Sequence, residues 1–382
     1  MKLTHGGKTP VRGIAKRSRA VKRIGAVAAL GLGALLMSGC DARDAMRFGW
    51  PEGITPQARD MGNLWTWSVI ACLVVGVLVW AAIFWTITFH RAKAGQETFP
   101  RQTAYNVPIE LTLTAVPFLV IAVLFYFTVI VQNNVEAKTD NPSVVVDVTA
   151  FQWNWKFGYR DVRGADGQPV KVTSGGEERT IKSTTGGPFQ LQQQVQTNAH
   201  GHEIPLPAGG RSDDVRNYLH FSNIETVGTS AEIPVLVLPT GKRIEFDIAS
   251  GDVIHSFWVP EFLFKRDVMP FPKQNHSDPS FQISSIDTEG AFVGRCAEMC
   301  GTYHSMMNFE VRAVSPQDFE RYVGYRLKNP TATNAQSLAA ICQQPVSVTT
   351  VPFDTRRGTN GSTPKDIGDP TNTKLANCTP EV

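Results

Sequence analysis

Two long apolar segments near the start of this chain constrain its fold more than any other feature. They run from Leu64 to Phe89 and from Pro108 to Val131. About 20 apolar residues are enough for a helix to cross a bilayer, so each segment predicts a membrane-spanning helix. The loop between them, residues 90–102, is short and basic, which favours the cytoplasmic side. We therefore expect a transmembrane helical hairpin over residues 62–132, with both outer ends and the rest of the chain on the extracytoplasmic side.

The N-terminal segment predicts export. Residues 1–23 are basic, and residues 24–37 form an apolar stretch that is too short for a comfortable membrane span but typical of a signal-peptide core. The stretch ends in Leu-Met-Ser-Gly-Cys, which resembles a lipoprotein cleavage box. We expect a lipoprotein-type signal peptide over residues 1–39, with Cys40 as the lipidated first residue of the mature chain. The alternative is an uncleaved anchor with an incidental cysteine. Residues 40–61 would form an external connector.

The net charge of the chain argues against nucleic-acid binding. The whole sequence carries +3, but eight of its Lys and Arg residues precede Cys40 with no acidic residue among them. Removing that segment leaves a net charge of −5, so the mature chain is mildly acidic. A mildly acidic protein has no electrostatic attraction for a polyanion.

The pattern after the hairpin predicts a β-sandwich. From Val144 the apolar residues alternate with other residues, and an aromatic-rich stretch follows at residues 151–159. Short apolar runs separated by Gly and Pro turns resume at Glu232. The expected fold class is therefore an α+β membrane protein, in which the two-helix hairpin precedes an all-β sandwich over residues 141–325.

Two polar regions interrupt or follow this sandwich. Residues 160–230 are rich in Gly, Ser, Thr and Gln and are interpreted as an insert. The histidines within it match no metal-ligand spacing and are interpreted as surface residues: His200, His202 and His220. The tail, residues 326–382, is low in apolar residues, so we expect it to be largely irregular. Cys342 and Cys378 in this tail would usually pair outside the cell, the alternative being two free thiols.

The segment from Cys296 to Met307 predicts a metal site. It supplies two thiols, one imidazole and thioethers within twelve residues, and a second imidazole, His255, lies upstream. Soft sulfur ligands combined with imidazole favour copper. Two alternatives are a disulfide between Cys296 and Cys300 and a structural zinc site, although zinc ligands usually come as two pairs and do not include methionine. One distant histidine with a loop bearing Cys, His and Met is typical of a copper-binding β-sandwich, and a second cysteine lets two thiolates bridge two metals.

The spacing Cys-x3-Cys-x3-His-x2-Met, with Asp-Val-x-His-Ser-Phe upstream, closely resembles subunit II of the haem–copper cytochrome c oxidases. The resemblance covers about residues 62–323 apart from the insert, and it implies a dinuclear CuA centre in a cupredoxin-like domain. The implied copper ligands are two bridging thiolates, one imidazole for each copper and two weak axial donors: Cys296 and Cys300, His255 and His304, and Met307 with the backbone carbonyl of Glu298. The carboxylate of Glu298 would reach a magnesium or manganese ion at the boundary with subunit I.

The same resemblance implies roles for two further residues. Glu110 breaks the apolar pattern of the second membrane segment, and an ionisable group there is a functional hypothesis by default. Its context, Glu-x-x-x-Thr-x-x-Pro, is similar to the family's helix, in which the glutamate lies at the mouth of a proton pathway into subunit I. The alternative is that it reaches the membrane interface. Trp153 lies in an aromatic strand that ordinarily indicates core packing, but the family match implies electron entry from cytochrome c.

We therefore expect an electron-transfer subunit of a respiratory oxidase in the cell membrane. Cytochrome c would deliver electrons near Trp153, and the copper centre would pass them to haem in subunit I, where oxygen is reduced to water and protons are translocated. The expected partners are oxidase subunits I and III. A nitrous-oxide-type reductase would need a large histidine-rich domain, whereas the chain has eight His. A quinol oxidase subunit would lack the two cysteines and the ligand histidines.

The lipoprotein box, the insert and the tail are similar to those of actinobacterial, mycobacterial-type subunits II. In that group the electron donor is often a dihaem cytochrome c subunit of a quinol:cytochrome c reductase, held in one supercomplex. Asp252 matches an acid on which soluble cytochrome c docks, but Gly251 occupies a neighbouring position that is often acidic in the family.

Overall fold

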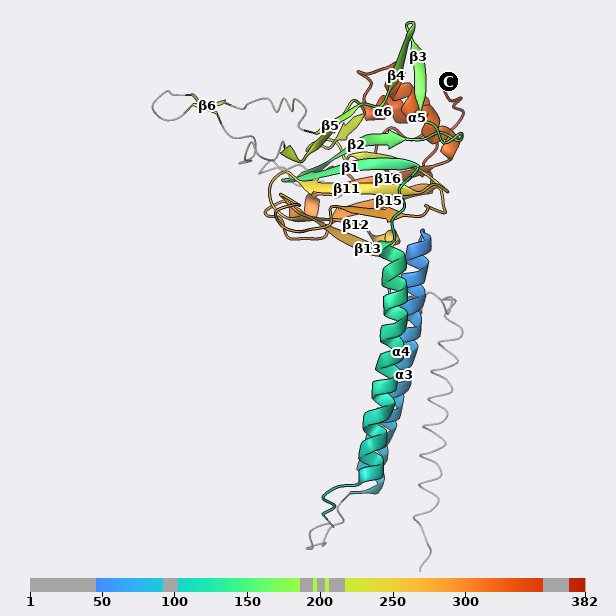
Figure 1. Cartoon of the computed structure of the whole chain (residues 1–382), viewed down its shortest axis with the longest axis vertical. Helices are drawn as coiled ribbons and strands as arrows, with labels where there is room; N and C mark the ends of the chain where they lie inside the picture. Colours follow the sequence, from blue (N-terminus) through green and yellow to red (C-terminus); the bar gives the residue numbers. More distant parts are fainter. Residues whose placement is uncertain are drawn as a thin grey trace, which may run out of the picture. The chain divides into compact units, whose positions relative to one another are not determined.

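The computed structural model describes residues 46–91, 102–185, 217–352 and 371–381, together with the backbone of two short strands at 195–197 and 203–205. The predicted signal peptide and the lipidation site at Cys40 lie outside the described residues. Two long helices open the described chain, α3 (Pro56–Phe89) and α4 (Val107–Glu136), and they run side by side (Figure 1).

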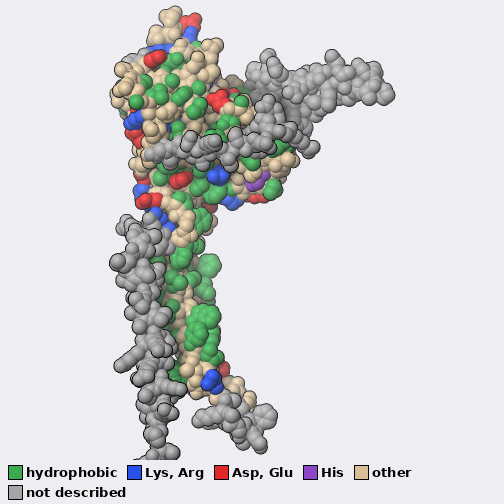
Figure 2. All heavy atoms as spheres, turned by 180° about the vertical axis from the view of Figure 1, so that it is seen from behind, with side chains coloured by type: hydrophobic (Ala, Val, Ile, Leu, Met, Phe, Trp, Pro, Cys, Tyr) green, Lys and Arg blue, Asp and Glu red, His purple; other side chains and the backbone are tan. Residues whose placement is uncertain are grey.

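Both helices are long and apolar enough to cross a membrane. Their apolar side chains are exposed along their length, as the hydrophobic surface in Figure 2 shows. Such a surface is unfavourable in water and favourable in lipid, so the prediction of two apolar helices of membrane-spanning length is confirmed. Helix α3 begins well before Leu64, because Thr55 caps it by accepting a hydrogen bond from the amide of Ala58. The end of the predicted connector is thus helical.

A sandwich of two five-stranded sheets follows the hairpin (Figure 1). In spatial order the first sheet contains β14 (Ser280–Ile283), β11 (Ile244–Ser250), β1 (Val144–Phe151), β2 (Asn154–Val162) and β9 (Glu225–Val227). The second contains β10 (Val235–Pro239), β16 (Asn308–Val314), β15 (Gly290–Cys296), β12 (His255–Val259) and β13 (Phe264–Val268). Strand β1 is parallel to β11, and β10 is parallel to β16; the other pairs are antiparallel.

The core of the domain lies between these two sheets. Alternate residues of each strand point inward, as a period of two requires: Phe246 on β11 and Phe309 on β16 are fully buried. Trp155 from β2 is the largest fully buried side chain, and its ring packs edge-on against Phe309 at a centroid distance of 5.1 Å. The aromatic strand therefore supplies core packing through Trp155, while Trp153 remains partly exposed.

The insert is more ordered than its composition suggests. The predicted start of the insert, residue 160, lies within β2, which extends to Val162. The predicted end, residue 230, lies after β9, which already belongs to the first sheet. Between them lie three antiparallel pairs: β3 (Lys171–Ser174) with β4 (Glu177–Thr180), β5 (Ser183–Thr185) with β8 (His220–Ser222), and β6 (Val195–Thr197) with β7 (Glu203–Pro205). The prediction was wrong there because a few buried residues, such as Val162 and Ile224, anchor a largely polar sequence.

The tail also differs from the expected irregular chain. Helix α5 (Pro316–Lys328) is followed by a short helix, α6 (Asn334–Ala340). Leu338 and Ile341 are buried in the main core, which explains why so few apolar residues can order this region. Cys342 and Cys378 form a disulfide, with their Cα atoms 5.5 Å apart.

A buried ion pair on β16 fastens part of this tail, residues 343–349, which we call the C-terminal strap. Glu310 and Arg312 are both fully buried on the outer side of β16, and Arg312 Nε donates to Glu310 Oε1 at 2.9 Å. The other carboxylate oxygen accepts hydrogen bonds from three consecutive strap residues, 347–349. The guanidinium donates to the carbonyls of Gln344 and Val346. The strap therefore supplies the partners that these buried charges require.

Candidate metal centre

The fold brings the predicted ligands together from two neighbouring hairpins. Strand β15 ends at Cys296 and β16 begins at Asn308, so the end of β15 and the loop between these antiparallel strands together carry four of the predicted side-chain ligands. Strand β12 pairs with β15 and begins at His255, which places that imidazole beside the loop. Gly301 has a φ of +117°, a backbone conformation that favours glycine. A single 3-10 turn, η4 (His304–Met306), then orients His304.

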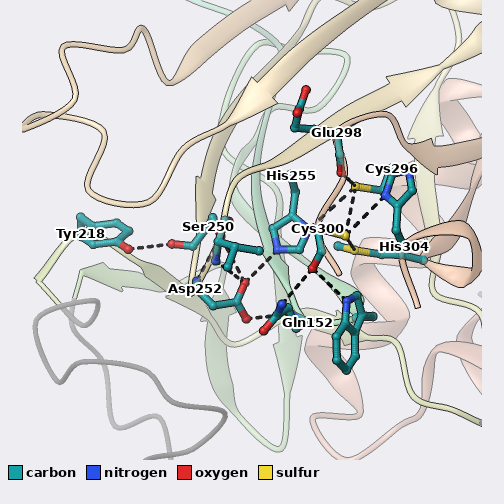
Figure 3. A network of polar contacts seen from close by, with 12 residues as sticks. Gln152, Tyr218, Ser250, Asp252, His255, Cys296, Glu298, Cys300 and His304 are labelled. Atoms are coloured by element: carbon teal, nitrogen blue, oxygen red, sulfur yellow. Dashed lines mark hydrogen bonds and ion pairs between the residues drawn. The ribbon is translucent and has the colours of Figure 1, made fainter. Parts of the chain in front are cut away.

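The donor atoms of these residues face one another (Figure 3). The sulfurs of Cys296 and Cys300 are 3.8 Å apart, much farther than the roughly 2.0 Å of a disulfide. Nδ1 of His255 lies 3.8 Å from the Cys296 sulfur, and Nδ1 of His304 lies 3.5 Å from the Cys300 sulfur. The thioether of Met307 lies 3.9 Å from the Cys300 sulfur. The structure thus contains two thiols, each with its own imidazole.

Most of the cluster is buried and its loop is held at both ends. His255 is fully buried, both cysteines and Met307 are nearly so, and His304 is partly exposed. The carbonyl of Met307 accepts hydrogen bonds from the amide of Cys296 and from the indole of Trp155, each at 3.2 Å. The carbonyl of Glu298 lies 3.3 Å from the Cys296 sulfur, while its carboxylate points away from the cluster (Figure 3). Two thiols, two imidazoles, a thioether and a carbonyl form a soft, largely dry donor set that fits copper.

Asp252 fixes the orientation of His255. Its Oδ1 lies 2.8 Å from His255 Nε2, so Nδ1 is the nitrogen that faces the sulfur. Burial would raise the pKa of Asp252, but its hydrogen bond with His255 lowers it overall. Burial likewise opposes a charged imidazole, yet the same hydrogen bond leaves the pKa of His255 above its usual value. A carboxylate–imidazole pair of this kind is a common support for a metal-binding histidine.

The two thiols differ in acidity. Burial works against ionisation of Cys296, but its contact with His255 lowers the pKa of this thiol to about 6. Burial, followed by the negative charge of Cys296, raises the pKa of Cys300 to about 12. Two thiolates this close repel one another, and a cation between them would offset that repulsion. The electrostatics of the cluster therefore favour occupation by a cation.

Trp153 and Gln152 lie in the turn between β1 and β2, not in a strand as predicted for Trp153, and both side chains contact the loop directly. The indole Nε1 of Trp153 donates to the carbonyl of Cys300 at 3.0 Å, and Gln152 Nε2 donates to the same oxygen at 2.8 Å. The ring of Trp153 also packs edge-on against Tyr303, with centroids 5.0 Å apart. Sequence reasoning missed Gln152 and the support that Asp252 gives to His255. The only sequence signals were the position of Gln152 beside Trp153 and the Asp-x-x-His spacing.

The remaining predicted residues lie apart from this cluster. Glu110 is in the first turn of α4, where its Oε1 accepts a hydrogen bond from the amide of the capping residue, Asn106, at 2.7 Å. His220, interpreted as a surface residue, is half-buried beside Asp147 and Asp247. Arg160 bridges these two carboxylates and compensates their charge, which leaves this group without the character of a metal site. His200 and His202 lie outside the described residues.

Known proteins resemble this chain over most of its length. Residues 220–314 match a family model described as cytochrome C oxidase subunit II, periplasmic domain. A probable cytochrome c oxidase subunit 2 from Nocardia farcinica is 58% identical over 92% of this chain and 92% of the relative. Cytochrome c oxidase subunit 2 of Mycobacterium tuberculosis is 52% identical over 91% of this chain and 93% of the relative.

Among solved structures, the periplasmic domain of subunit II of cytochrome oxidase from Bradyrhizobium japonicum matches 51% of this chain and 100% of that domain, with 20% identity and a TM-score of 0.28. The family model for the periplasmic domain matches residues 220–314 of the sandwich, which identifies the sandwich as the cupredoxin-like domain of this family, and the two helices fit a membrane protein with an extracytoplasmic domain. With relatives this similar over nine-tenths of its length, the chain belongs to the cytochrome c oxidase subunit 2 family, whose members are subunits of haem–copper terminal oxidases.

Proposed function

We propose that this chain accepts electrons from cytochrome c at a dinuclear CuA centre and passes them towards haem in subunit I, where oxygen is reduced and protons are translocated. The observation that carries the proposal is the pairing of two buried, unlinked thiols with two imidazoles in one cluster. Cys296 and Cys300 would bridge two copper ions, with His255 and His304 as terminal ligands and Met307 and the Glu298 carbonyl as axial donors. A thiolate-bridged copper pair supplies a one-electron carrier whose charge is shared between two ions.

The protein's part in this function is to keep the donors in place. The Met307 carbonyl accepts a hydrogen bond from the amide of Cys296 and so joins the two ends of the loop. Asp252 holds the His255 ring through a hydrogen bond, which restricts rotation of that imidazole. Burial of the cluster excludes most water. A rigid and dry set of ligands moves little between redox states, which is what fast electron transfer requires.

Trp153 is the proposed point of electron entry. Its ring is partly exposed, and its indole nitrogen is hydrogen-bonded to the backbone of Cys300, a proposed ligand. One hydrogen bond therefore separates a surface ring from the metal cluster. On another side of the cluster, the outward-pointing carboxylate of Glu298 is the proposed ligand for magnesium or manganese at the subunit I boundary.

The membrane part is proposed to serve proton entry and assembly. Glu110 would admit protons to a pathway in subunit I, although its hydrogen bond to Asn106 also gives it a capping role. The chain would reside in the plasma membrane with subunits I and III, after removal of the predicted lipoprotein signal and lipidation of Cys40.

The electron donor would be cytochrome c or a dihaem cytochrome c subunit of a reductase supercomplex. The docking surface would lie on the insert, residues 160–230. We assign it to the segment between β5 and β8, residues 186–216, because β8 and β9 are built into or against the first sheet. Support for this location comes from Tyr218, which follows this range closely in the chain. Its hydroxyl is hydrogen-bonded to Ser250, in the turn whose Asp252 accepts from Gln152 beside Trp153.

Rapid mixing of the purified oxidase with reduced cytochrome c tests the proposal. In Trp153→Phe an apolar ring is kept while the indole donor is lost, so electron uptake at the copper centre should slow with the copper spectrum intact. Trp65→Phe, an exposed indole in α3, is the control and should react as the wild type does. Equal uptake rates in all three proteins would return Trp153 to a packing role.

A further inference from the structure

The C-terminal end of the insert contacts the turn that supports the metal centre. Tyr218 closely follows residues 186–216 of the insert in the chain, and its hydroxyl donates a hydrogen bond to the backbone carbonyl of Ser250 at 2.6 Å (Figure 3). The Tyr218 ring packs edge-on against Phe271, with centroids 5.3 Å apart. The hydroxyl is thereby held in a fixed position over the end of β11.

Ser250 opens a tightly bonded turn. It is fully buried, and its amide donates to the carbonyl of Met269. Its hydroxyl accepts from the amide of Asp252 at 3.1 Å and donates to the carbonyl of Val253. Asp252 Oδ1 in turn accepts from the amide of Val253 at 2.8 Å. Because these bonds interlock, a rotation of the Ser250 peptide would shift the Asp252 carboxylate.

Asp252 connects this turn to both sides of the metal cluster. Its Oδ1 is bonded to His255 Nε2, and its Oδ2 accepts from the amide of Gln152 at 2.7 Å. Gln152 then donates to the carbonyl of Cys300. The position of one carboxylate thus affects one proposed copper ligand directly and another through Gln152, as the continuous chain of contacts in Figure 3 shows.

We propose that Tyr218 is a positioning residue for the metal centre, acting through the Ser250 carbonyl and Asp252 to orient His255. A buried carbonyl that loses its donor must either remain unsatisfied or turn towards a new partner, and here turning displaces Asp252. The inference rests on the proposed copper site, but the hydrogen-bond network exists without metal. It makes the base of the insert a support of the metal site.

The test compares two tyrosines in the full oxidase. Tyr218→Phe removes only the hydroxyl and keeps the ring. Tyr159→Phe is the matched control, since the Tyr159 hydroxyl also donates to a buried carbonyl, that of Val237, at 2.6 Å. We expect both variants to melt at a lower temperature. Only Tyr218→Phe should alter the histidine nitrogen hyperfine coupling of bound copper and hasten copper loss to a chelator roughly fivefold, the factor that corresponds to about 1 kcal/mol.

A second comparison tests the route. In an Asp252→Asn background, Tyr218→Phe should add nothing further to copper loss, because the residue through which it acts is already changed. In metal-free protein, hydrogen exchange of a peptide spanning residues 250–255 should be faster in Tyr218→Phe than in Tyr159→Phe. Copper loss that matches the control, or that is additive with Asp252→Asn, would overturn the positioning role. A wild-type site that binds no copper pair would instead overturn the proposed function, and the exchange result would still stand.

Discussion

Replacing Glu310 by Gln should destabilise the metal-binding domain far more than a surface charge would. Glu310 and Arg312 have no exposed side-chain area, and strap residues 347–349 donate their hydrogen bonds to the Glu310 carboxylate. The substitution leaves the guanidinium buried without a counter-charge, and it replaces one acceptor oxygen with an amide NH2, a donor that must face the donors of Arg312 or of the strap. Breaking a buried pair in this way costs about 3–5 kcal/mol, which corresponds to a loss of roughly 6–20 °C in melting temperature for a domain of this size.

The matched control is Glu178→Gln on β4. Glu178 pairs with Lys171 at 3.1 Å, but the two side chains are 60% and 52% exposed, so this change should cost about 0–1 kcal/mol. Thermal unfolding of the two purified variants, with limited proteolysis to detect release of the strap, measures the difference. If Glu310→Gln has the same melting temperature as Glu178→Gln and the strap remains protected from proteolysis, the strap does not depend on the ion pair.

Three other predictions concern protons, partners and pH. Glu110→Gln should lower steady-state turnover while electron uptake at the copper centre stays normal; unchanged turnover would leave Glu110 as a helix cap. Replacing residues 186–216 by a Gly-Ser turn keeps the β5–β8 pair, so the copper spectrum should persist while co-purification with the reductase weakens; an intact supercomplex at full quinol oxidase rate would contradict docking there. Burial raises the pKa of Asp147 from 3.8 to about 6, although the charge of Arg160 acts in the opposite direction. The raised pKa therefore contributes stability that is fully present below about pH 4 and is lost as the pH rises to about 6. The melting-temperature difference between wild type and Asp147→Asn should therefore change over this range and be constant above it.

Local patterns made the hairpin and the metal loop predictable. A run of apolar residues is enough to identify a membrane helix, and four ligands within one loop leave their spacing visible in the sequence. His255 was found because its neighbours match a known motif, not because anything in the sequence showed that β12 pairs with β15. Cys342 and Cys378 could be paired in prediction because the tail contains no other cysteine.

The supports of the site were not visible in the sequence because they join residues far apart in the chain. Gln152 and Cys300 are 148 positions apart, and Tyr218 and Ser250 are 32 apart. Glu310 and Arg312 alternate with apolar residues, as exposed residues of a surface strand do, and only the tail that covers them makes them buried. The composition of that tail suggested disorder because few of its residues are apolar, but a small buried set that includes Leu338 and Ile341, together with the disulfide, is enough to fix it.

The copper content and electron paramagnetic resonance spectrum of the full-length chain test the central claim most directly. Two thiolates shared by two ions should give two copper atoms per chain and a hyperfine pattern in which one unpaired electron is spread over both nuclei. In Cys300→Ser, where the bridge is broken, that pattern should collapse to one localised copper, while Cys72→Ser in α3 should leave it unchanged. A single copper per wild-type chain with an isolated blue-copper spectrum would contradict the account.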